Sequence, residues 1–128
     1  MMSHEKHEKH LKEIVEKLKK DKDVLALIVY GSYARDEPYR DIDLCIVLYP
    51  EAEDKNFEKR LEYSEYEDID VQIFNTLPLY IKVRIFKEGK LIHCKDEELL
   101  YDIAIRTIKE YELFKPRYKL YLEGVLYG

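Results

Sequence analysis

Two aspartates separated by a single residue stand at the start of an apolar run. Asp41 and Asp43 flank Ile42, and the run continues to Leu48. In a β-strand, residues two apart point to the same face, so the two carboxylates would lie side by side and Ile42 would face the other way. Carboxylates so placed repel each other, and aspartate is a poor strand former. We therefore expect a divalent metal ion between Asp41 and Asp43.

A third aspartate stands in a comparable position. In residues 69–74 apolar and polar residues alternate, and Asp70 lies on the polar face. If this strand neighbours the one that carries Asp41 and Asp43, the three carboxylates would converge at one end of the sheet. Two-metal sites hold their ions about 3.5–4 Å apart between such carboxylates. Asp68 is the alternative third ligand, but Asp70 is preferred because it lies deeper in the apolar strand.

A second feature belongs to the same region. The apolar run 24–30 ends abruptly at Gly31-Ser32. A strand that breaks there and enters a helix leaves unpaired backbone N–H groups pointing outward, and the helix dipole strengthens the resulting anion site. Ser32 is expected to cap this short helix, and Pro38 to end it. Phosphate at the turn and metal at the nearby aspartates together describe a nucleoside triphosphate site.

Three side chains near the turn have open roles. Arg35 fits contact with phosphates and fits equally well an ion pair with Asp36 or Glu37. Neither Tyr33 nor Arg40 can be assigned from the sequence.

The signature residues resemble those of a known family. Gly31-Ser32-Tyr33-Ala34-Arg35, followed by Asp41-Ile42-Asp43-Leu44, is similar to the signature of the minimal nucleotidyltransferases of the DNA polymerase beta superfamily. The resemblance implies an α/β nucleotidyltransferase fold, with a small mixed β-sheet and helices packed on one face. It extends to the MNT antitoxins of the MntA type.

The resemblance also implies roles for the matching residues. Asp41 and Asp43 would hold the metal bound to the triphosphate, and Asp70 would help to hold a second metal that activates the acceptor hydroxyl. These three are the expected catalytic residues, with Mg²⁺ as the cofactor and ATP as the substrate. The expected nucleotide-binding residues are Gly31, Ser32 and Arg35.

The reaction implied by the resemblance is transfer of AMP from ATP to a hydroxyl, catalysed mainly by positioning and charge neutralisation. Chains of this length in the superfamily tend to be partners of HEPN-type helical toxins, so a tyrosine of such a toxin is the implied acceptor. Two alternatives stay open. One is a small-molecule nucleotidyltransferase of the aminoglycoside type, and the other is a non-enzymatic binding antitoxin with a vestigial nucleotide site.

Bulk properties limit the partners. A chain of 128 residues indicates one nucleotidyltransferase domain, 1–128, with a helical tail over about 96–128. A net charge of −5 argues against a long nucleic acid as partner. Two irregularly spaced cysteines favour a cytoplasmic location. No membrane span or signal-peptide core is expected, whereas a homo- or hetero-oligomer is compatible with the sequence.

The remaining elements follow from periodicity and capping residues. An amphipathic helix is predicted over 4–20, and its histidines His4, His7 and His10 are expected to be solvated rather than metal ligands. A loop is predicted over 51–56 and a weak helix over 57–66. A further helix should begin at Asn75-Thr76 and end at Gly89, followed by a short edge strand over 90–94.

The last helix should begin at Asp96 and be kinked at Pro116. Several tyrosines crowd this region, and core packing and a protein–protein surface both explain them: Tyr101, Tyr111, Tyr118, Tyr121 and Tyr127.

Overall fold

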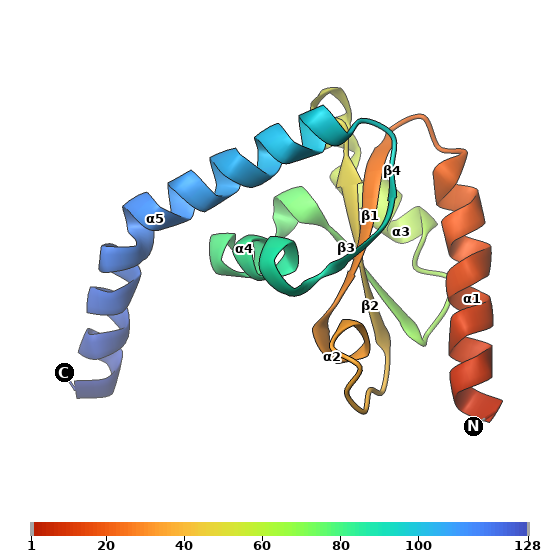
Figure 1. Ribbon diagram of the computed structural model, residues 1–128, viewed down its shortest axis with the longest axis horizontal. Helices are drawn as coiled ribbons and strands as arrows, with labels where there is room; N and C mark the ends of the chain where they lie inside the picture. The colour runs from red at the N-terminus through yellow and green to blue at the C-terminus, as the bar shows by residue number, and fades with distance from the viewer. Residues whose placement is uncertain (1, 128) are drawn as a thin grey trace.

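A four-stranded β-sheet forms the centre of the described part of the chain (Figure 1). The computed structural model describes the backbone of residues 2–127 and the side chains of residues 4–115. The strand order is β3-β2-β1-β4. Strand β1 (Val24–Tyr30) is antiparallel to both β2 (Ile42–Leu48) and β4 (Lys90–Cys94), whereas β2 is parallel to β3 (Ile69–Ile73). The mixed sheet predicted from the sequence is confirmed, and β4 is an edge strand as expected.

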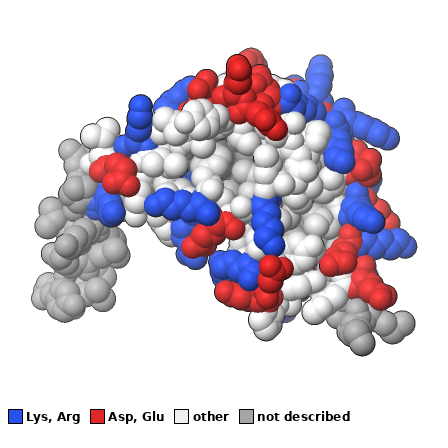
Figure 2. Space-filling model, in the orientation of Figure 1, with Lys and Arg blue, Asp and Glu red and all other residues white. Residues whose placement is uncertain are grey.

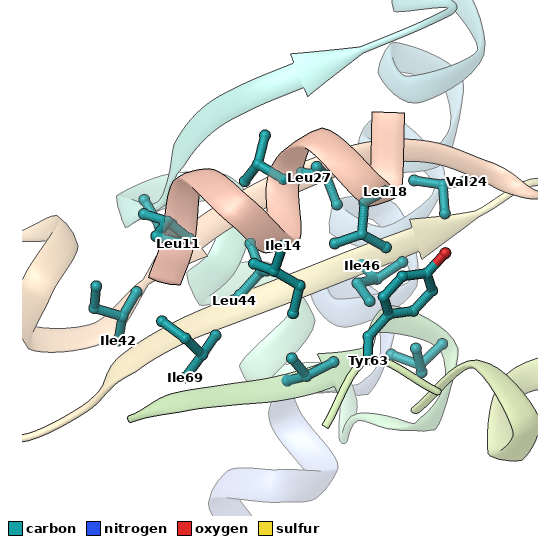
Figure 3. Packing of buried hydrophobic residues seen from close by; sticks show 14 of the residues in the cluster. Leu11, Ile14, Leu18, Val24, Leu27, Ile42, Leu44, Ile46, Tyr63 and Ile69 are labelled. Carbon is teal, nitrogen blue, oxygen red and sulfur yellow. The ribbon is translucent and has the colours of Figure 1, made fainter. Parts of the chain in front are cut away.

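Helix α1 (Met2–Lys19) covers one face of the sheet. Its apolar residues recur at the helical period, so they form one stripe that packs on the inward residues of β1, β2 and β3. Figure 3 shows Leu11, Ile14 and Leu18 of the helix above Leu44 and Ile46 of β2. Burial of this stripe supplies the hydrophobic contribution that holds α1 to the sheet.

The other face is also covered. Alternate residues of β1 and β2, among them Leu25 and Val47, pack against α4 (Leu79–Glu88) and α5 (Glu97–Tyr127). Figure 1 shows α1 on one side of the sheet and α4 and α5 on the other. The helices therefore lie on both faces rather than on one, which agrees with the apolar character of both faces of β1 and β2.

Helix α5 extends well beyond the sheet (Figure 1). Its first turn is capped as predicted, because the Leu99 N–H donates to Oδ1 of Asp96 over 3.1 Å. The helix continues through Pro116 to Tyr127 and bends along its length, away from the sheet (Figure 1). The side chains of Tyr118, Tyr121 and Tyr127 lie outside the described residues. No helix within residues 2–127 combines the length and the apolar character needed to cross a membrane.

The segment between β2 and β3 differs from the sequence prediction. Residues Pro50–Lys55 form a 3₁₀-helix, η1, rather than a loop, and α3 (Asn56–Glu62) follows directly. Phe57 and Leu61, the apolar residues four apart on which the predicted helix over 57–66 depended, are 75% and 63% exposed. The buried anchor is Tyr63, whose hydroxyl donates to Oδ2 of Asp21 over 2.6 Å.

An ion-pair cluster completes this attachment of α3. The Lys59 ammonium lies 2.8 Å from Asp21 and 3.1 Å from Asp23, both in the turn between α1 and β1. Lys55 of η1 lies 3.3 Å from Asp23. The connection after β2 is therefore held mainly by buried polar contacts, which hydrophobic periodicity does not reveal.

Two predicted helix caps are absent. At α2 (Gly31–Ala34) the N-cap residue is Tyr30, Ser32 lies inside the helix, and the helix ends at Ala34, before Pro38. A 3₁₀-helix, η2 (Phe74–Thr76), precedes α4, and Thr76 donates its hydroxyl to the carbonyl of Ile73 instead of capping. In both places the helical segment follows directly on a strand, and no side chain caps its first turn.

Two of the three histidines of α1 are not solvated as expected. Nδ1 of His10 lies 2.9 Å from both carboxylate oxygens of Asp68, and Nε2 of His7 lies 3.8 Å from one of them. His4 is exposed. The contacts with Asp68 attach α1 to the segment that leads into β3.

Candidate functional site

Asp43 and Asp70 face each other across two neighbouring strands. The parallel register pairs Ile42 with Ile69 and Asp43 with Asp70, so the two carboxylates share the face opposite the isoleucines. The Ile42 N–H donates to the carbonyl of Asp68 over 2.9 Å and fixes this register at the start of β2. The convergence of these two aspartates, predicted from alternation alone, is thus present.

The third carboxylate can now be placed. Asp68 is engaged by His10 on the α1 side, whereas Asp70 lies beside Asp43 and accepts a hydrogen bond from Gln72 over 3.1 Å. Asp70, rather than Asp68, therefore belongs to the acidic site. Asp41 lies in a bend immediately before β2, and its side chain is exposed.

The electrostatics of the pair are unfavourable for two charged carboxylates. The pKa of Asp43 is raised to about 6, first by burial, then by the charge of Asp70 and a hydrogen bond with it, and then by the charge of Asp41. Arg35 opposes this shift. Burial, followed by the charges of Cys45, Asp43 and Asp70, also raises the pKa of Tyr30. The site holds excess negative potential that a cation would offset.

The donor set fits a hard divalent cation. Carboxylate oxygens are the ligands preferred by Mg²⁺, which usually binds one or two carboxylates together with substrate phosphates and water. Within residues 4–115, no three or more Asp, Glu, His or Cys side chains converge closely enough to hold a metal ion by themselves. The structure thus brings together Asp43 and Asp70, with the exposed Asp41 near enough for its charge to act on Asp43.

The turn at the end of β1 lies directly beside Asp43. Gly31 has a φ of +74°, in the left-handed region that favours glycine. A Cβ atom at this position would lie 2.3 Å from Oδ2 of Asp43. Glycine is therefore required here both by the backbone conformation and by the approach of the carboxylate, and the predicted phosphate turn and acidic pair are neighbours.

A cleft of about 260 Å³ opens beside this turn and Asp43. Its lining residues come from β1, α2, β2 and α4: Tyr30, Gly31, Ser32, Arg35, Asp43, Ile81, Arg84 and Glu88. A larger hollow of about 430 Å³, between α4, β4 and α5, is lined mostly by apolar residues and contains none of the three aspartates. The smaller cleft is the candidate site because it joins the Gly31 turn to the Asp43 carboxylate.

The cleft settles part of the open assignments near the turn. Arg35 pairs with Glu37 over 3.1 Å, as one of the two interpretations expected, and it also lines the cleft, so its contact with phosphate stays a prediction. Tyr33 packs edge-on against Tyr39, with ring centroids 5.0 Å apart, and contributes to the core beneath α1. Arg40 is exposed.

The contribution of α4 was missed from the sequence. Ile81, Arg84 and Glu88 reach the cleft from a helix some forty residues beyond Asp43 in the chain. Their spacing of three and four places them on one face of α4. Nothing in the sequence indicates that this face borders the turn at Gly31, because the contact depends on how α4 packs on the sheet.

The fold and site define the class of protein. Residues 12–98 match the family described as polymerase beta, nucleotidyltransferase, and this match spans more than half of the chain. The chain belongs to the polymerase beta nucleotidyltransferase family. The resemblance seen in the signature residues is confirmed, and so is the enzyme class at the level of the family.

One relative is similar to this chain in sequence. Over 78 residues the chain is 37% identical to a candidate protein adenylyltransferase of Methanocaldococcus jannaschii. The match covers 59% of this chain and 61% of the relative, so the chain spans less than two thirds of that protein's length.

Solved structures share the fold. One, a toxin–antitoxin complex with AMP-PNP, contains a chain similar at a TM-score of 0.65 with 17% identity, over 89% of this chain and 97% of that one. A second, a tri-AMPylated Shewanella oneidensis HEPN toxin with its MNT antitoxin, gives a TM-score of 0.65 with 14% identity, over 95% and 98%. At these identities the likeness establishes the fold.

Proposed function

We propose that this protein transfers AMP from ATP to a tyrosine hydroxyl of a HEPN-type helical partner, in a metal-dependent reaction, and acts as the antitoxin of that pair. The observation that carries the proposal is the pair Asp43 and Asp70, facing each other beside the Gly31 turn at the edge of a cleft. Carboxylates beside a cleft that can take phosphate groups are the arrangement that metal-assisted phosphoryl transfer uses.

Each residue of the site has a task in this reaction. Asp41, Asp43 and Asp70 would hold Mg²⁺, with Asp41 turning inward from its exposed position. Bound Mg²⁺ supplies charge neutralisation at the phosphates and lowers the pKa of the attacking hydroxyl. Gly31, Ser32 and Arg35 hold the triphosphate in the cleft. The acceptor oxygen bonds to the α-phosphorus and loses its proton, the bond to the β-phosphate oxygen breaks, and pyrophosphate leaves.

Two kinds of relative support a protein acceptor. The Methanocaldococcus jannaschii relative is named for adenylyl transfer to protein, and the Shewanella oneidensis complex contains an AMPylated HEPN toxin beside an MNT antitoxin. The net charge of −5 also suits a protein acceptor better than a polynucleotide. A cytoplasmic location follows from the same proposal.

The test combines ATP labelled at the α-phosphate, Mg²⁺, this protein and a HEPN-type toxin. We expect label on the toxin with the wild-type protein, loss of label with Asp43→Ala, and loss of label when a chelator replaces Mg²⁺. Replacement of the target tyrosine by phenylalanine should also remove the label. Complex formation without label anywhere, and unaffected by Asp43→Ala, would establish the binding antitoxin instead.

A further inference from the structure

Three charged side chains meet above the cleft. Arg35 extends from the end of α2, whereas Arg84 and Glu88 lie one turn apart on α4. Nη1 of Arg35 and Nη2 of Arg84 each lie 3.6 Å from the same atom, Oε2 of Glu88. Two guanidinium groups from different elements therefore converge on a single carboxylate oxygen.

This convergence defines a position that suits an anion. Two guanidinium groups directed at one point repel each other unless a negative oxygen lies between them. Arginine recognises phosphate and carboxylate oxygens by the same planar arrangement of N–H donors, so a phosphate oxygen can replace the glutamate oxygen. The position borders the cleft that also contains Gly31 and Asp43, so an anion bound there would be continuous with the proposed triphosphate site.

The glutamate is held in place by the packing of α4. Val83 and Ile85 are buried against the sheet, so the helix cannot rotate freely. At the end of α4, a Cβ atom on Gly89 would lie 2.5 Å from the carbonyl oxygen of Ile85 and 2.6 Å from Cγ2 of Ile28. This close approach to β1 fixes the last turn, and with it the backbone that carries Glu88.

The ion pairs themselves are easily exchanged. The side chains of Arg35, Arg84 and Glu88 are 34%, 59% and 45% exposed, and pairs so exposed contribute little to stability because water screens them. A polyphosphate carries several charges where Glu88 carries one. The arginines can therefore leave the glutamate for phosphate without disturbing the fold.

We propose that Arg84 is a second phosphate-binding arginine, paired with Arg35, and that Glu88 occupies the phosphate position when no nucleotide is bound. This inference rests on the proposed function, since it places a nucleoside triphosphate in this cleft. Glu88 acts as a built-in competitor that weakens binding of the triphosphate and bridges the two arginines when no nucleotide is bound, while Arg35 also keeps its shorter pair with Glu37, at 3.1 Å.

The test is a set of dissociation constants for ATP in the presence of Mg²⁺. Arg84→Gln should raise the constant and Glu88→Gln should lower it, each by roughly two- to fivefold, as expected for exposed charge pairs. Matched controls with the same charge changes are Arg106→Gln on α5 and Glu58→Gln on α3, both exposed and outside the cleft lining. Neither control should alter binding beyond what net charge produces.

Two further measurements separate this role from a merely structural one. Inorganic tripolyphosphate should follow the same order of affinities as ATP, whereas binding of adenosine should be the same in all variants. In the background of Arg84→Gln, the effect of Glu88→Gln should shrink, because the two residues act on one phosphate. The melting temperature of each variant confirms that it is folded.

The outcomes distinguish the two proposals. If the wild-type protein binds neither ATP nor tripolyphosphate, the proposed function fails, and this inference fails with it. If the wild-type protein binds ATP but Glu88→Gln and Arg84→Gln match their controls, the inference is overturned and the proposed function stands. The inference is also overturned if the variants change the binding of adenosine as much as the binding of ATP.

Discussion

Gly31 determines whether the turn and the carboxylate can lie together. Its φ of +74° costs a residue with a side chain roughly 1–2 kcal/mol, and an added methyl group would overlap Oδ2 of Asp43. We expect Gly31→Ala to lower the free energy of unfolding by about that amount and to abolish AMP transfer, because the Asp43 carboxylate must move. Thermal unfolding and the labelling assay measure the two effects. Retained transfer would show that Asp43 does not need its present position.

Asp43 illustrates the cost of a functional side chain. Because its pKa in the folded protein is raised to about 6, ionisation is less favourable in the folded state than in the unfolded chain. At low pH, where Asp43 is protonated in both states, this destabilisation is absent. It grows as the pH rises from about 4 through 6. Above that range, with metal removed, we expect Asp43→Asn to stabilise the protein by about 1 kcal/mol after allowance for solvent screening.

The measurement is chemical denaturation of both proteins at pH 5 and pH 8 in the presence of a chelator. The gain should be larger at pH 8, and the variant should be inactive in AMP transfer. An equal or lower stability of Asp43→Asn at pH 8 would mean that no electrostatic cost is stored at this position.

The sequence predicted the position of a site residue correctly where the alternation of side chains along a strand was enough to place it. The pairing of Asp43 with Asp70 required only that the two strands be neighbours in parallel register. Prediction failed for Arg84 and Glu88, whose place in the cleft depends on the angle at which α4 packs on the sheet. Asp41 stays a predicted ligand: it precedes the first paired residue of β2, so strand alternation does not fix the direction of its side chain.

Among the elements, α1 and the central strands were predicted well and α3 was not. The apolar stripe of α1 and the apolar runs of β1 and β2 report burial directly, since each is several residues long and periodic. Helix α3 is held through Lys59 and Tyr63, which contact the acidic turn after α1. A sequence pattern based on hydrophobicity selects Phe57 and Leu61 instead, and both of these apolar side chains are exposed.

The attachment of α3 should therefore depend on Asp21. Burial raises the pKa of this carboxyl, but hydrogen bonds from Lys59, Tyr63 and the Asp23 amide outweigh it, so the pKa lies below its usual value of 3.8. Stability from Asp21 is present above the unfolded value and is lost as the pH falls below about 4. We expect Asp21→Asn to cost about 1–2 kcal/mol at pH 7.

The control for this variant is Glu51→Gln, which removes an exposed carboxylate of η1. The difference between the two variants should shrink as the pH falls from about 4 through the lowered pKa of Asp21 in the folded protein, because the Asp21 carboxyl of the control is then protonated. Equal stability of Asp21→Asn and the control at pH 7 would show that α3 is held by other contacts.

At the scale of the whole molecule, the distribution of charge and the course of α5 are compatible with the proposed protein partner. Figure 2 shows acidic and basic side chains mixed over the visible face, without a continuous basic stripe that could follow a nucleic-acid backbone. Helix α5 extends beyond the sheet (Figure 1) and, within the described residues, carries the exposed apolar side chain of Leu113. Both features fit a protein that meets another protein while it holds a nucleotide in a small cleft.

Nucleotide binding in that cleft should stabilise the whole domain. The cleft joins residues of β1, α2, β2 and α4, so a ligand there must be released before the sheet unfolds. At a ligand concentration of about one hundred times the dissociation constant, mass action adds about 2.7 kcal/mol to the free energy of unfolding. We expect ATP with Mg²⁺ to raise the melting temperature by several degrees, and ATP with a chelator to raise it less.

Asp41→Asn should keep its unliganded melting temperature within about a degree of wild type, since its side chain is exposed, yet lose most of the ligand-induced increase. An unchanged wild-type melting temperature at millimolar ATP and Mg²⁺ would show that the nucleotide does not bind in this cleft. An undiminished increase in Asp41→Asn would show that Asp43 and Asp70 hold the metal without Asp41.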